Sequence, residues 1–160
     1  MRQFAEHEQV RIYRKYLGLS QSELAGQMGT LPNTVARWES GEWTITQRVL
    51  CHIRKLVELR LKDQMHKAFA EIMPELPISE FTRLFGIPTV ESTEDNTGRL
   101  YMGIIFIDGC RAYTLHFSAE DGSLWAIGRG GSARRMDEAL LRKIRETVTM
   151  AAMQRAEKKQ

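Results

Sequence analysis

The chain has 160 residues, enough for one domain or two small ones, and 42% of them are hydrophobic, which suffices for a core. No apolar run approaches the roughly 20 residues that span a bilayer, and the polar start MRQFAEHEQV lacks the features of a signal peptide. The two cysteines, Cys51 and Cys110, lie far apart and form no metal or redox motif. We expect a cytoplasmic protein with two buried free thiols and no membrane partner.

The net charge of +3 is small, but it is unevenly distributed. Residues 1–73 carry 11 Lys and Arg against 8 Asp and Glu, whereas residues 74–160 carry 12 of each kind. The positive surplus therefore falls in the first half of the chain. A small excess is enough for nucleic acid if it is clustered, because affinity for phosphates comes from local contacts.

The chain begins with a predicted helix from Phe4 to Leu17, ended by Gly18. Ser20 and Glu23 have the spacing of a capping box at the start of a second helix. Gln21 would then lie at an exposed helix N-terminus, beside N–H groups that can bind a phosphate.

Two short helices joined by a tight turn are predicted between Gln21 and Trp38. Ala25 is small enough for a second helix to cross closely, and Gly29 suits the left-handed end of the first helix. Pro32 suits the first turn of the next helix, which we expect to end near Ser40. These features, with apolar residues at helical spacing on both segments, are what a helix-turn-helix requires.

The flanking residues complete a longer pattern. R-x-x-x-G-L-S-Q-x-E-L-A-x-x-x-G starts at Arg14, and x-x-T-V-x-R-W-E-x-G ends at Gly41. Together they closely resemble the Cro/lambda-repressor-like, or XRE-type, DNA-binding domain over about residues 10–45. The rest of the chain resembles no family that we can name. The resemblance implies that the N-terminal part of the third helix enters the DNA major groove.

The resemblance also assigns roles to single residues. Positions that touch base edges in that family are occupied here by Leu31, Pro32, Asn33 and Arg37. Asn33 is suited to adenine, Arg37 to guanine and Leu31 to a thymine methyl, while Pro32 offers no backbone donor. Thr34 should also point outward. Alternatively, Asn33 is only a helix-start residue and Arg37 a solvated charge.

In the resembled family an ion pair locks the first helix to the third, and its positions are occupied here by Arg14 and Glu39. Alternatively, both are solvated surface charges. Trp43, in the loop that follows, is expected to pack beneath the third helix or, less readily, to touch the DNA backbone.

From Thr46 to Met73 the apolar residues recur every three or four positions without Gly or Pro, which predicts one helix of up to about 28 residues. Its stripe comprises Leu50, Ile53, Val57, Leu61, Met65, Ala68 and Ile72. Such a stripe must be buried against the next domain or against the same helix of a second subunit. Pro74 and Pro77 then mark a domain boundary, dividing the chain into residues 1–73 and 74–160.

The second half reads as a small α+β domain. Ser79 caps a predicted helix from Glu80 to Phe85, and the segment from Glu91 to Arg99 reads as a polar loop. Three strands should then form an antiparallel meander, with a hairpin turn at Asp108-Gly109. The predicted strands and the last helix span Leu100 to Ile107, Arg111 to Ser118, Leu124 to Gly128, and Arg134 to Ala156.

Catalytic and ligand motifs are weak in this chain. The GRGGS segment at residues 128–132 could hold a phosphate but lacks the Lys and the spacing of a P-loop. The histidines have no common metal spacing, and no nucleophile with a base stands out. We therefore expect neither an enzyme nor a cofactor.

These patterns predict a sequence-specific transcriptional regulator, expected to be a repressor, that binds a palindromic operator in double-stranded DNA as a homodimer. Its dimer contact is placed on Ile104, Ile105, Phe106 and Ile107, in a strand buried on both faces or paired across the two-fold axis. Two alternatives stay open. The C-terminal half could bind a protein partner, as in an antitoxin, or could hold a small effector.

Overall fold

The computed structural model describes residues 2–107 and 113–159. The expected hairpin turn at Asp108-Gly109, and Cys110 after it, lie outside these ranges. The helices are α1 (Glu6–Tyr16), α2 (Gln21–Met28), α3 (Pro32–Ser40), α4 (Gln47–Ile72), α5 (Ile78–Phe85) and α6 (Glu138–Lys158). The strands are β1 (Arg2–Gln3), β2 (Thr89–Glu94), β3 (Leu100–Phe106), β4 (Tyr113–Ser118), β5 (Leu124–Gly128) and β6 (Ala133–Arg135).

The helices begin and end where local chemistry favours it. Ser20 accepts a hydrogen bond from the N–H of Glu23 at 3.1 Å, and Thr46 and Asp137 cap α4 and α6 in the same way. Gly29 ends α2 in the left-handed region, with φ of 67°. The capping box and the long helix predicted from the sequence are therefore confirmed.

All six strands form one antiparallel sheet in the order β1-β2-β3-β4-β5-β6. The class is α+β, as expected, but the sheet is larger than the predicted three-stranded meander. The segment from Glu91 to Arg99 was expected to be a loop, and this was wrong, because its first residues belong to β2, which pairs with both β1 and β3. The start of the predicted last helix was also wrong, since residues 133–135 form β6 and the helix begins at Glu138.

Two smaller expectations need correction. Helix α5 begins after Pro77, so Ser79 lies within its first turn and does not cap it. Cys51 is exposed on α4, whereas a buried thiol was expected.

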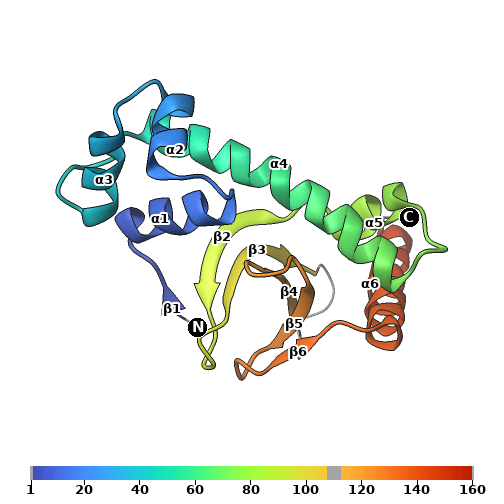
Figure 1. Ribbon diagram of the computed structural model, residues 1–160. Helices are drawn as coiled ribbons and strands as arrows, with labels where there is room; N and C mark the ends of the chain where they lie inside the picture. Colours follow the sequence, from blue (N-terminus) through green and yellow to red (C-terminus); the bar gives the residue numbers. More distant parts are fainter. Residues whose placement is uncertain (1, 108–112, 160) are drawn as a thin grey trace.

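Helix α4 connects the two ends of the molecule (Figure 1). Helices α1, α2 and α3 gather around its beginning, whereas its second half lies over the sheet with α5 and α6 nearby. Its buried stripe follows the predicted positions except that Ile72 is only half-buried and Phe69 is buried as well. The stripe therefore packs within a single chain.

The hydrophobic core runs without interruption from the helical end to the sheet. Leu61 of α4 packs directly on β3, where a Cβ on Gly103 would lie 3.0 Å from both of its methyl carbons. Phe69 stacks on Phe81 of α5 with a ring separation of 4.2 Å. The predicted boundary after residue 73 coincides with the end of α4, although β1 joins the N-terminus to the sheet and the core crosses that boundary. Within the described residues, no helix combines the length and the apolar character needed to cross a membrane.

Candidate nucleic-acid interface

Helices α2 and α3 cross closely because the residues between their axes are small or tightly buried. Ala25 is buried on α2, and Val35 is buried on the facing side of α3. The N–H of Thr30 donates to the carbonyl of Ala25 at 2.9 Å, which closes the turn after Gly29. Pro32 then occupies the first turn of α3, where its missing N–H costs no helical bond. The turn thus fixes the direction in which α3 leaves α2.

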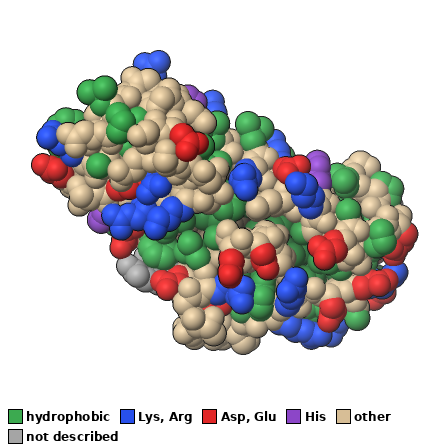
Figure 2. All heavy atoms as spheres, in the orientation of Figure 1, with side chains coloured by type: hydrophobic (Ala, Val, Ile, Leu, Met, Phe, Trp, Pro, Cys, Tyr) green, Lys and Arg blue, Asp and Glu red, His purple; other side chains and the backbone are tan. Residues whose placement is uncertain are grey.

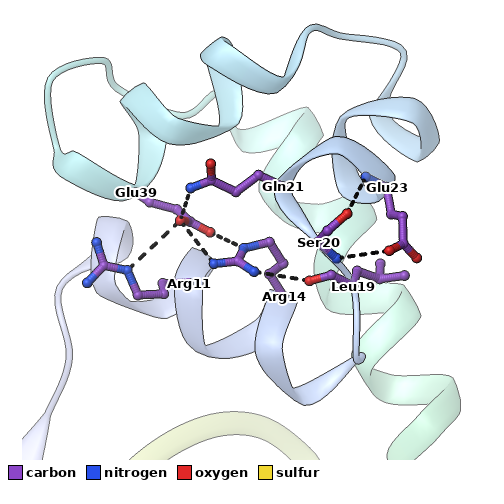
Figure 3. A network of polar contacts seen from close by, with 7 residues as sticks. All are labelled: Arg11, Arg14, Leu19, Ser20, Gln21, Glu23 and Glu39. Atoms are coloured by element: carbon purple, nitrogen blue, oxygen red, sulfur yellow. Dashed lines mark hydrogen bonds and ion pairs between the residues drawn. The ribbon is translucent and has the colours of Figure 1, made fainter.

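A polar network centred on Glu39 joins α1, α2 and α3 (Figure 3). The Glu39 side chain is almost fully buried. Arg14 donates to both of its carboxylate oxygens, from Nη2 at 3.3 Å and from Nε, and Gln21 donates from Nε2 at 2.8 Å. Arg14 also donates from Nη1 to the carbonyl of Leu19 at 3.0 Å. One carboxylate therefore fixes the positions of three helices.

The network keeps Glu39 ionised inside the protein. Burial by itself opposes the charged form, but hydrogen bonds from Arg14 and Gln21 and the nearby positive charges outweigh it, so the pKa of the Glu39 carboxyl lies below its ordinary value. Arg11 adds a weaker contact, with its Nε 3.9 Å from Oε2. A buried carboxylate is tolerable here because it is paired and hydrogen-bonded.

The N-terminal turn of α3 presents an exposed surface at the end of the molecule opposite α6 (Figure 1). Leu31 is 70% exposed, and both Pro32 and Asn33 are exposed. Thr34 is half-buried. Side chains on this turn are therefore open to contact from outside the protein.

Arg37 lies farther along the same helix and is held by two neighbours. Its guanidinium carbon lies 4.4 Å from the centre of the Trp43 ring, and its Nε lies 3.9 Å from a Glu42 carboxylate oxygen. Trp43 is 45% exposed, so it is not part of the core but packs at the rim of α3. Its ring supports the Arg37 side chain by a cation–π contact. This support was not predicted from the sequence, although the pairing of Arg and Trp six residues apart was visible there.

Gln21 has a different environment from the one expected. It is half-buried, and its side-chain N–H₂ group donates to Glu39. The amide is therefore part of the network that holds the helices together.

The residues expected to form a dimer contact are divided between the core and the surface. Ile104, Ile105 and Ile107 are buried within the chain, whereas Phe106 is 66% exposed. Strand β3 lies between β2 and β4, so its main chain is hydrogen-bonded along both edges. Pairing of this strand across a two-fold axis is therefore excluded, because the sheet already uses both of its edges.

Positive side chains gather over α1 on the face drawn in Figure 2, next to α3, the helix that carries Asn33 and Arg37. Arg11 and Lys15 are exposed on α1.

No group of three or more His, Cys, Asp or Glu residues in the described part of the chain is arranged to hold a metal ion. Comparison of the chain with protein-family models, curated proteins and solved structures finds no match. The chemistry of this surface is therefore judged from its own residues.

Proposed function

We propose that the protein is a sequence-specific DNA-binding transcriptional regulator that inserts the beginning of α3 into the major groove. The observation that carries the proposal is the combination of an exposed N-terminal turn on α3 with a buried network that fixes α3 against α1 and α2. Base recognition needs side chains held on a rigid element, because a loosely held donor loses specificity. The resemblance over residues 10–45 points to the same surface.

The exposed side chains have the chemistry to read base edges. Asn33 carries an amide that pairs in a bidentate manner with adenine, and Arg37 carries a guanidinium that pairs in the same manner with guanine. Leu31 offers an apolar contact for a thymine methyl group. Arg11 and Lys15 on the neighbouring α1 would attract the phosphates of the DNA backbone.

We further propose that the protein binds as a homodimer and acts as a repressor. One such helix touches only a few base pairs, and a second copy related by a two-fold axis doubles both the base and the phosphate contacts. Apolar side chains for pairing remain on the surface, since Met150 and Met153 are exposed on the last turns of α6.

Selection of bound duplexes from a random library tests this function directly. A two-fold symmetric consensus is expected, and its half-site spacing would report the distance between the two α3 helices. Light scattering during size-exclusion chromatography should give the mass of a dimer. Enrichment of no sequence, with only a steep loss of affinity in salt, would contradict sequence-specific reading.

A further inference from the structure

We infer that the concave face of the sheet binds a small aromatic molecule that carries an N–H or O–H donor, with His116 as its hydrogen-bond acceptor. This inference does not depend on DNA binding. It is argued from a cavity, from two buried polar atoms without partners, and from the arrangement of apolar side chains around them.

The sheet is strongly curved, and α4 and α6 lie on its convex side (Figure 1). Cross-strand pairing places Ile104 beside His116 and His116 beside Trp125, and it places Phe106 beside Thr114 and Thr114 beside Ile127. Gly103, the neighbour of Ile104 in β3, faces Leu61 of α4, so Ile104 and His116 point to the opposite, concave side. On this face, apolar side chains from neighbouring strands therefore surround the imidazole of His116.

A cavity of about 420 Å³ lies on this face. Ile104, Phe106 and Ile127 supply its apolar lining, and its polar and charged groups come from Glu91, Thr93, Asn96, Thr114, His116 and Arg129. The turn between β2 and β3 approaches the glycine-rich β5–β6 hairpin at its edge, since a Cβ on Gly131 would lie 3.9 Å from Nδ2 of Asn96. The volume of the cavity falls in the range of roughly 300–1,000 Å³ that is usual for small-molecule sites.

Three buried side-chain atoms of the described residues have no hydrogen-bond partner, and two of them, Nδ1 of His116 and Oγ1 of Thr93, belong to residues that line this cavity, whereas the third, Oγ of Ser92, does not. His116 and Thr93 are only 2% and 4% exposed. Buried polar side chains in folded proteins are nearly always hydrogen-bonded. Two exceptions on the wall of one cavity point to a ligand that supplies the missing partners.

The tautomer of His116 defines what such a ligand must offer. Nε2 of His116 lies 2.8 Å from Oγ1 of Thr114, and that hydroxyl donates to the carbonyl of Ile127 at 3.5 Å. We assign the imidazole proton to Nε2, because this tautomer satisfies both hydrogen bonds of the Thr114 hydroxyl, and Nδ1 is then an acceptor. Burial lowers the pKa of His116 to about 4, so the ring is neutral at pH 7. The ligand must therefore bring a donor.

The rest of the cavity selects the body of the ligand. Phe106 exposes most of its ring on this face, and Ile104 and Ile127 flank the imidazole. A planar aromatic body suits such a surface, because rings stack offset or edge-to-face on phenylalanine. Phenols and indoles offer both the aromatic body and the donor.

The test uses the full chain without DNA and follows its amide and imidazole NMR signals during titration with indole. Indene is the matched probe, because it has the same ring shape but no N–H donor. Indole is expected to shift the signals of Ile104, Phe106, His116 and Ile127 in a saturable manner, and to shift Nδ1 of His116 as a new hydrogen bond forms. Indene should bind at least about tenfold more weakly, as the loss of one buried hydrogen bond predicts.

Variants separate binding from folding. His116→Phe keeps the ring volume and removes the acceptor, and Phe106→Ala truncates a mostly exposed side chain that the fold does not need. Both should weaken indole at least about tenfold, whereas Leu59→Ala, at an exposed apolar position on α4, should leave binding unchanged. Absence of saturable shifts on this face, equal affinity for indene, or unchanged affinity in Phe106→Ala would overturn the inference.

Discussion

Arg14 on α1 and Glu39 on α3 form an ion pair across 25 positions of sequence, and the carboxylate end of the pair is buried. The same carboxylate accepts from Gln21 on α2, so all three helices that precede α4 depend on one side chain. If α3 reads DNA, its orientation is set by this pair and by the small Ala25 at the crossing with α2.

Glu39→Ala should be strongly destabilising, because it leaves the Arg14 guanidinium without its carboxylate in a mostly buried site. We expect a loss of about 3 kcal/mol in the free energy of unfolding. Replacing both partners, as in Arg14→Met with Glu39→Met, should cost less than Glu39→Ala alone, since no unpaired charge remains. Urea denaturation of Arg14→Met, Glu39→Met and the double variant measures the coupling. A double variant as unstable as the two single losses added together would show that the pair is not coupled.

Arg37→Ala should weaken binding to the selected operator by about 1–3 kcal/mol and relax preference at one base pair. Trp43→Ala should have a smaller effect in the same direction, because it removes the ring that holds Arg37 in place. Arg83→Ala is the matched control, since it removes one exposed arginine from α5, away from α3. Fluorescence anisotropy with labelled duplexes gives the affinities. A similar loss from Arg83→Ala would mean that only net charge matters.

The helices could be predicted well because their signals are local. Ser20 and Glu23 define a cap within four residues, and the stripe of α4 repeats at helical spacing over its whole length. The contact between Arg14 and Glu39 was inferred only from the resemblance, since no local rule joins residues 25 positions apart. The contact between Trp43 and Arg37 was not predicted, because no local rule joins a loop side chain to a helix residue six positions earlier.

The strands that the sequence did not predict are polar. Strand β2 reads TVESTE, and its identity comes from pairing with β1 and β3 rather than from hydrophobic alternation. Strand β6 reads ARR, and charged side chains of this kind suit the edge of a sheet, where they discourage association with other chains. The cavity around His116 was equally hidden, because the curvature of the sheet brings together residues from four strands.

His116→Phe should remove part of the acid sensitivity of the protein. Burial lowers the pKa of His116 from 6.5 to about 4, so the unfolded chain binds a proton at a higher pH than the folded chain does. The stabilisation that His116 provides is therefore fully present above pH 6.5 and is lost as the pH falls from 6.5 to 4. Below pH 4 this residue causes no further loss. The full loss is about 3 kcal/mol.

Denaturation midpoints measured across this pH range test the assignment. The slope between pH 6.5 and 4 should flatten in His116→Phe and persist in His66→Phe, which changes an exposed histidine on α4. Protonation of Glu39 reduces stability only at a lower pH, because the pKa of its carboxyl lies below the ordinary value of 4.5. An unchanged slope in His116→Phe would show that the imidazole is not held neutral by burial.

Gly103→Ala should destabilise the junction between α4 and the sheet. The new Cβ would lie 3.0 Å from both methyl carbons of Leu61, which is fully buried and has little room to move, and 3.4 Å from Cβ of Pro88. We expect a cost of about 1–3 kcal/mol from overpacking.

Leu61→Ala alone should cost about 2–5 kcal/mol through the cavity it leaves. In the double variant the added methyl group fills part of that cavity, so Gly103→Ala should cost much less in the Leu61→Ala background than in the wild-type chain. Urea denaturation of the four proteins measures this coupling, and equal costs in the two backgrounds would mean that α4 does not pack on β3 at this point.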